Sequence, residues 1–63
     1  MTPENFKRIR QQLGLTQAEL ARALRITEGR TIRRYESGER PISGPVAIIM
    51  EALADGRIDL ESL

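Results

Sequence analysis

The segment Gln17 to Leu24 carries a nearly complete start signal for an α-helix. Thr16 stands at an N-cap position and Glu19 follows three residues later, so that each side chain can bond the backbone N–H of the other. Leu15 and Leu20 occupy the two positions of a hydrophobic staple. A helix this short needs a neighbour, because most helical stability in proteins comes from packing of the apolar face. The chain is therefore expected to fold as short helices that cover one another.

Capping residues and glycines predict three further helices, and strand patterns are nearly absent. The expected helices run from the N-terminus to about Leu13, from about Glu28 to Ser37, and from Pro45 to near Asp55. Their predicted caps are Thr2, Thr27 and Ser43 or Gly44, and their predicted stops are Gly14, Gly38 and Gly56. Residues 57–63 are compatible with a frayed tail, a short helix or an interface segment. One all-α domain over residues 1–63 is expected.

Apolar residues recur at helical spacing in all four segments and predict a single core. The expected core positions are Phe6, Ile9, Leu13, Leu20, Leu24, Ile32, Tyr35, Val46, Ile49, Met50 and Leu53. Ile48 points away from the apolar stripe of its helix, so we expect it to be exposed and to face a partner.

The composition excludes most hydrolytic mechanisms. The 63 residues include no Cys and no His, so disulfides, thiolate or imidazole metal ligands and imidazole-activated nucleophiles are all ruled out. We expect a protein that is not an enzyme and that needs no cofactor and no metal. No stretch approaches the roughly 20 apolar residues of a membrane span, and no signal peptide pattern is present. The expectation is a soluble protein inside the cell that has no membrane partner.

Charge is unevenly divided along the chain. Residues 1–40 hold nine basic and five acidic residues, a net charge of +4, and the remainder has a net charge of −3. Such a division indicates a basic side that faces a polyanion. In the segment from Glu28 to Ser37, Ile32 and Tyr35 lie on one helical face, and the opposite face presents Arg30, Arg33, Arg34 and Ser37. A helix of this kind suits the DNA major groove, although a merely solvated arginine face gives the same pattern.

A set of motifs resembles the helix-turn-helix of the Cro/C1-type (XRE) repressor family over about residues 6–54. The matching parts are LGLTQAELA, Ile26, Ile32, Tyr35 and the run YESGERP. The resemblance implies a compact bundle of four or five short helices, as in lambda-repressor-like DNA-binding domains. It also implies a sequence-specific transcriptional regulator, a repressor, that is cytoplasmic, encoded by a bacterium or phage, and associated with the nucleoid when bound.

Residue roles follow from the resemblance by position. The helix from Glu28 to Ser37 is expected to enter the major groove of double-stranded DNA. The expected base contacts are Arg30, Arg33 and Arg34, and the expected phosphate contacts are Gln17, Arg22 and Arg40. Gly29 falls at a base-reaching position, but it has no side chain, so we expect close approach of its backbone or a turn. Arg10 and Glu36 lie at matching offsets from their apolar stripes, and the resemblance implies that they form a structural ion pair.

Two departures from the family pattern affect the turn before that helix. Arg25 stands where the family usually has Gly, and one extra residue separates Ile26 from Ile32. A left-handed arginine costs about 1–2 kcal/mol. We therefore expect the extra residue to reshape the turn and relieve Arg25 of that conformation.

The sequence leaves the partners of the chain open. A homodimer through the fourth helix and the C-terminal segment is expected, because paired half-sites add DNA specificity. One alternative is an antitoxin of a toxin–antitoxin pair that binds DNA and covers a toxin with its acidic, apolar C-terminal part. Another is a helical protein-interaction module without DNA binding, whose arginines meet an acidic protein.

Overall fold

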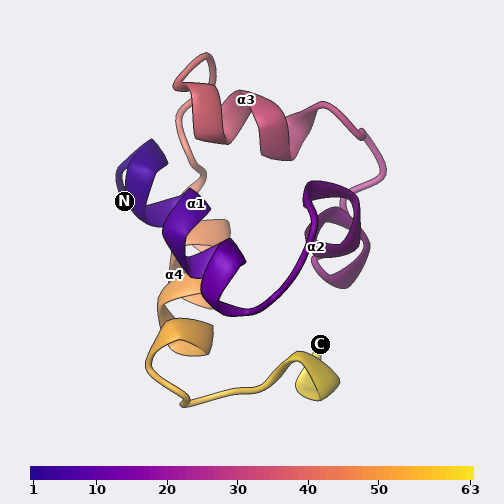
Figure 1. Cartoon of the computed structure of the whole chain (residues 1–63), viewed down its shortest axis with the longest axis vertical. Helices are drawn as coiled ribbons and strands as arrows, with labels where there is room; N and C mark the ends of the chain where they lie inside the picture. Colours follow the sequence, from indigo (N-terminus) through magenta and orange to yellow (C-terminus); the bar gives the residue numbers. More distant parts are fainter.

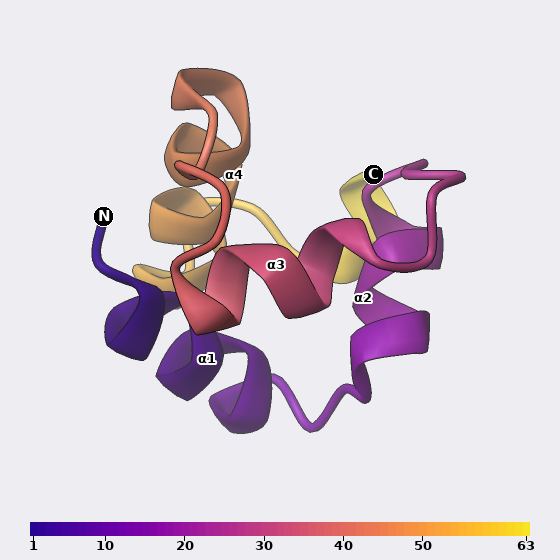
Figure 2. The ribbon, with the colours of Figure 1, turned by 90° about the horizontal axis from the view of Figure 1, so that it is seen from above.

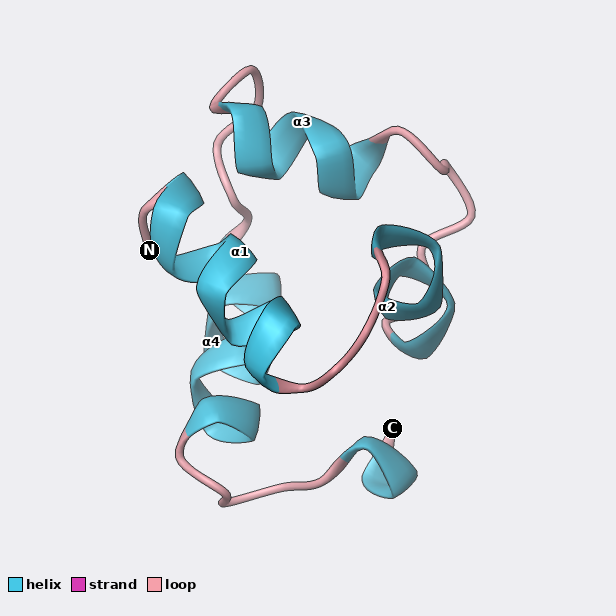
Figure 3. Cartoon of the chain, in the orientation of Figure 1, coloured by secondary structure: helices cyan, strands magenta, loops and turns pink.

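Four α-helices and one short 3₁₀ helix make up the computed structural model, which describes all 63 residues and contains no strand (Figures 1 and 3). The helices are α1 (Pro3–Gln12), α2 (Gln17–Ala23), α3 (Thr31–Ser37), α4 (Gly44–Ala54) and η1 (Leu60–Ser62). The all-α fold class is confirmed. No helix is both long enough and apolar enough to span a membrane.

Three of the four predicted helix starts are present. The Thr2 side chain accepts a hydrogen bond from the N–H of Asn5 at 3.1 Å, and Ser43 caps α4 in the same way. Both bonds of the predicted capping box are made: the Thr16 hydroxyl accepts from the N–H of Glu19 at 3.1 Å, and the Glu19 carboxylate accepts from the N–H of Thr16 at 2.9 Å. These side chains satisfy amide groups that the helices leave unpaired.

Each α-helix contributes one fully buried side chain to a common core. Phe6, Leu20, Ile32 and Met50 are all 0% exposed, and the ring of Tyr35 meets that of Phe6 edge to face with centroids 5.5 Å apart. Burial of one such side chain contributes about 1.5–3 kcal/mol. Because α3 supplies two of these five residues, its inner face is anchored at the centre of the domain.

The start of α3 corrects the sequence prediction. The helix begins at Thr31 rather than near Glu28, Thr27 does not cap it, and the N-cap residue Arg30 has no side-chain capping bond. Instead, Glu28 closes a turn: its carbonyl accepts from the N–H of Thr31 at 3.1 Å, and its carboxylate accepts from the N–H of Arg30 at 3.2 Å. The poor helix propensity of Gly29 favours this turn over a further helical turn.

The backbone of Arg25 corrects a second prediction, because the residue is left-handed, with φ +60°. Its N–H donates to the carbonyl of Arg22 at 3.1 Å, and the N–H of Ile26 donates to the carbonyl of Ala21 at 2.8 Å. This pair of bonds is the Schellman ending, which requires a left-handed residue after the helix whatever its side chain. Helix α1 ends in the same way at Gly14, with φ +74°.

The C-terminal segment forms a short helix rather than a frayed tail. Asp59 caps η1 by accepting a hydrogen bond from the N–H of Ser62 at 3.0 Å. Three apolar side chains of this segment pack against the core; they are Ile58, Leu60 and Leu63. Ile48 of α4 is 67% exposed, so the predicted exposure of this side chain is confirmed.

Replacement of Arg25 by glycine should stabilise the domain, since glycine adopts a left-handed backbone without steric cost. Relief of about 1–2 kcal/mol of strain, less the entropy that glycine adds to the unfolded chain, leaves a gain of about 0.5–1 kcal/mol. Urea unfolding measures this gain. Arg25→Ala is the control, because it removes the same guanidinium and keeps the strain. Equal unfolding free energies for the two variants would show that the backbone of residue 25 is not strained.

The capping box should also make the stability depend on pH. The N–H and hydroxyl of Thr16 hold the pKa of Glu19 below its ordinary value of 4.5. A lowered pKa stabilises the fold above the unfolded pKa, and this contribution is lost as the pH falls through the folded pKa. Glu19→Gln keeps an acceptor and removes the charge, so the difference in unfolding free energy between it and the wild type should shrink in acid below pH 4.5. A difference that stays constant over this range contradicts the assignment.

Candidate nucleic-acid interface

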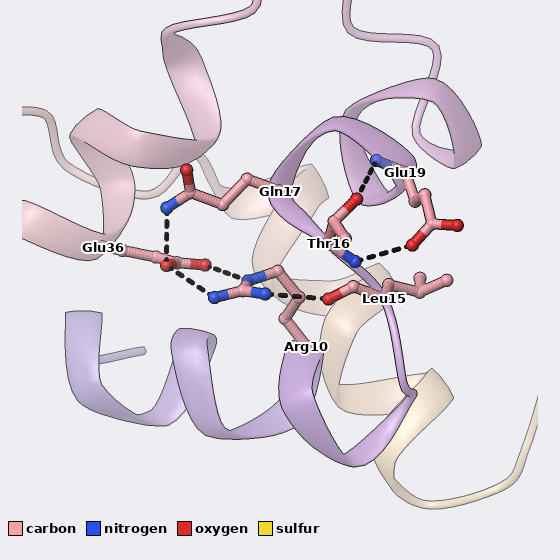
Figure 4. Close-up of polar contacts among 6 residues, drawn as sticks. All are labelled: Arg10, Leu15, Thr16, Gln17, Glu19 and Glu36. Atoms are coloured by element: carbon pink, nitrogen blue, oxygen red, sulfur yellow. Dashed lines mark hydrogen bonds and ion pairs between the residues drawn. The ribbon is translucent and has the colours of Figure 1, made fainter.

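A buried ion pair joins the first and third helices, as Figure 4 shows. The Nε of Arg10 donates to Oε2 of Glu36 at 2.6 Å, and Nη2 of Arg10 donates to Oε1 of the same carboxylate at 3.2 Å. The two side chains are only 12% and 5% exposed. Two parallel bonds between a planar guanidinium and a carboxylate fix the relative orientation as well as the distance of the two groups. The ion pair implied by the family resemblance is therefore present in the fold.

Two more hydrogen bonds extend this pair to the second helix. Nη1 of Arg10 donates to the carbonyl of Leu15 at 2.8 Å, and Nε2 of Gln17 donates to Oε1 of Glu36 at 3.0 Å (Figure 4). No buried side-chain polar atom of the structure lacks a hydrogen-bond partner. The network thus ties α1, the turn that follows it, the first residue of α2 and the C-terminal end of α3 to one another.

The outer side of α3 is left uncovered by this arrangement. Figures 1 and 2 show α3 along one edge of the molecule, with no other element over that side. The buried side chains of the helix are Thr31, Ile32 and Tyr35, and Arg33 and Ser37 are exposed. Arg34 lies at the margin with 35% of its side chain exposed, and Arg30 is exposed at the N-cap. Three guanidinium groups therefore lie on or beside the uncovered face.

The remaining predicted contact residues fall on elements next to α3. Arg22 is exposed on α2, and Arg40 is exposed in the loop after α3, where its N–H donates to the carbonyl of Arg34 at 3.3 Å. Gln17 is half-buried through its bond to Glu36. A phosphate or a base can accept a hydrogen bond from this N–H only in competition with the carboxylate of Glu36, but the second hydrogen of Nε2 remains available as a donor.

Gly29 lies exposed in the connection before α3, and the fold itself does not require a glycine there. Its φ is outside the left-handed region, and a Cβ built at this position meets no atom within 4 Å. Gly29 does lie in a turn, as expected, but the conformation of its backbone does not demand a glycine. Open space on the outer side is compatible with the other expectation, an approach of the backbone to a partner.

Three polar contacts near this face were not predicted from the sequence. The Gln17–Glu36 bond joins residues 19 positions apart, the Glu28 carboxylate bonds a backbone N–H, and Glu39 lies 3.9 Å from Nε of Arg34. Glu28 lies in the connection before α3, and Glu39 lies in the loop after it. Their positions depend on how the two loops around α3 fold, so no helical spacing in the sequence reports them.

The buried pair should couple the stabilities of two single variants. Removal of one partner of such a pair costs about 3–5 kcal/mol, because the other charge stays buried without a partner. We expect Arg10→Met and Glu36→Leu each to lose stability of this size in urea unfolding, and the double variant to recover much of it. The exposed pair of Arg34 and Glu39 is the control, since its disruption should change the unfolding free energy by less than about 1 kcal/mol. Additive losses in the buried pair contradict the coupling.

Comparison with protein families agrees with this geometry. A family model described as helix-turn-helix matches residues 6–59, which covers α2, α3 and α4 completely and α1 from Phe6 onward. No curated protein and no solved structure matches the chain. The matched region includes the network around Glu36 and the uncovered face of α3. On this evidence the chain belongs to the Cro/C1-type helix-turn-helix family of DNA-binding transcription regulators.

Proposed function

We propose that this protein is a sequence-specific repressor that occupies its operator as a homodimer, with α3 in the major groove of double-stranded DNA. One observation carries the proposal: α3 is fixed from behind by the bidentate pair of Arg10 and Glu36, and its uncovered side presents arginines. A reading helix must hold its side chains within hydrogen-bond reach of base edges. The ion pair fixes the inner side of α3 and the arginines lie on its outer side, so α3 meets that requirement.

Base contacts are assigned to Arg30, Arg33 and Arg34. An arginine fork fits O6 and N7 of guanine, so a guanine-containing half-site is expected. Because Arg30 is the N-cap and not an interior residue of α3, its side chain leaves the N-terminal end of the helix. The N-terminal end is the part of a recognition helix that contacts base edges. The shorter helix therefore keeps Arg30 in a reading position.

Phosphate contacts are assigned to Gln17, Arg22 and Arg40, and close backbone approach to Gly29. The second amide proton of Gln17 can reach a phosphate while the first stays on Glu36, which would connect the DNA backbone directly to the buried network. Arg22 and Arg40 are exposed on the elements that flank α3 in the chain. Contacts of this kind set the register of the protein on the duplex and carry no sequence information.

Dimer formation is assigned to α4 and the C-terminal segment. Ile48 is 67% exposed on α4, and a second copy of the chain would remove this side chain from water. A two-fold dimer reads two half-sites about 34–36 Å apart, or multiples of this spacing. Repression then follows from occupancy, because bound protein excludes polymerase from the same DNA. This function places the protein in the cytoplasm of a bacterium or of a phage-infected cell, associated with the nucleoid when bound.

Selection of bound duplexes from a random pool tests the proposal and separates base contacts from phosphate contacts. Arg34→Ala should change the preferred base pair at one position in each half-site, since each good base contact discriminates by about 1–3 kcal/mol. Arg40→Ala should weaken selected and random duplexes alike and reduce the dependence of log Kd on log salt by about 1. Fluorescence anisotropy titrations at several salt concentrations measure both effects.

Arg57→Ala is the matched control for these variants. It removes the same charge from the segment between α4 and η1, at the far end of the molecule from α3 (Figure 1). Its only ion pair is an exposed one with Asp55 at 3.2 Å. This variant should keep the selected sequence. If Arg34→Ala lowers the affinity for selected and random duplexes by the same factor, Arg34 does not read a base.

A further inference from the structure

A carboxylate lies beside one of the proposed base-reading arginines. Oε2 of Glu39 is 3.9 Å from Nε of Arg34, and the two side chains are 64% and 35% exposed. Glu39 is not on α3 but in the loop that follows it. The two residues are five positions apart, so no helical neighbour relation brings them together.

The fold of this loop places the carboxylate. Gly38 is left-handed with φ +83°, which turns the chain back over the end of α3. The Ser37 hydroxyl donates to the carbonyl of Arg34 at 3.2 Å and accepts from the N–H of Glu39 at 3.4 Å. The N–H of Arg40 also donates to the Arg34 carbonyl, at 3.3 Å. The backbone of Glu39 is thus held against the residue with which its side chain pairs.

The geometry of the pair leaves the reading end of the arginine free. Glu39 approaches Nε, on one side of the guanidinium, so both terminal amino groups remain available for O6 and N7 of guanine. A guanine edge is neutral overall, and it can add to the pair without displacing the carboxylate. A phosphate is an anion, and its approach to the same guanidinium brings two negative groups together. The carboxylate therefore opposes phosphate contacts of Arg34 more than base contacts.

From this asymmetry we infer that Glu39 is a specificity-determining residue, which lowers binding to random DNA by keeping Arg34 from phosphates. The inference rests on the proposed reading of DNA by α3. Non-specific binding comes almost entirely from cation–phosphate contacts, so a base-reading arginine that also binds phosphate strengthens every wrong complex. Glu39 reduces non-specific binding through Arg34 and does not itself contact a base.

A second acidic residue near α3 provides a control of equal charge. Glu28 lies before the other end of the helix, and its carboxylate accepts from the backbone N–H of Arg30 instead of pairing with a guanidinium. Glu28→Gln keeps an acceptor for that N–H and removes one negative charge. It should therefore report the general repulsion between an acidic side chain and DNA, without any effect that passes through an arginine.

The experiment compares Glu39→Gln, Glu28→Gln and the wild type on the duplex that the wild type selects and on a random duplex of equal length, at fixed salt. Glu39→Gln should lower the ratio of the two affinities by about two- to fivefold, the size expected when an exposed ion pair is lost. Glu28→Gln should change both affinities by one common factor. In an Arg34→Ala background, Glu39→Gln should no longer change the ratio. The melting temperatures of the wild type and of Glu39→Gln should be the same.

Each outcome decides between the two proposals. If the wild type prefers its selected duplex but Glu39→Gln shifts both affinities by the same factor, or acts equally without Arg34, the inference about Glu39 is wrong and the proposed function stands. If the wild type binds no duplex better than a random one, the proposed function fails and the inference fails with it. NMR of the protein without DNA tests the pair directly, through the Nε–H resonance of Arg34. If this resonance is the same in the wild type and in Glu39→Gln, the inference is also overturned.

Discussion

The bidentate contact between Arg10 and Glu36 is the interaction on which the geometry of the domain depends. Apolar packing of Phe6, Leu20, Ile32 and Met50 brings the helices together, but packed apolar surfaces tolerate small rotations of one helix against another. Two parallel hydrogen bonds between planar groups, at 2.6 and 3.2 Å, do not tolerate such rotations, because both the direction and the distance are defined. Through this pair the apolar core, which carries most of the stability, is connected to the exposed face of α3, which carries the proposed function.

The residues that join these two parts have more than one role. Glu36 accepts from both Arg10 and Gln17, so the residue proposed to bind a phosphate is bonded to the carboxylate that orients the reading helix. The proposed base contacts and phosphate contacts therefore share one rigid body. The acidic residues beside α3 also have defined positions: Glu28 closes the turn before the helix, and Glu39 pairs with Arg34 after it. Of these two, only Glu39 faces a guanidinium, and it is the residue that we propose to limit contacts that are not specific for sequence.

Local sequence signals predicted the parts of the fold that local forces decide. The capping box of Thr16 and Glu19 and the buried stripe of each helix follow from spacing along a single element, and the structure contains them. The start of α3 was predicted wrongly, because the low helix propensity of Gly29 and the turn bonds of Glu28 outweighed the cap signal of Thr27. The left-handed Arg25 was predicted wrongly, because the backbone bonds of the Schellman ending outweighed the preference of arginine. The contact of Glu39 with Arg34 depends on how the loop after α3 turns back over the helix at Gly38, so the spacing of residues in one helix could not reveal it.

The central claim is that the outer face of α3 enters the duplex while the network behind it stays intact. NMR titration of the isotopically labelled protein with a short duplex at low salt tests this claim most directly. The account predicts large shifts for the side-chain Nε–H groups of Arg33 and Arg34 and for the backbone of residues 29–34, with the Arg10 Nε–H resonance retained in its bonded position. Shifts confined to α1 and α4, or loss of the Arg10 resonance on binding, would contradict it.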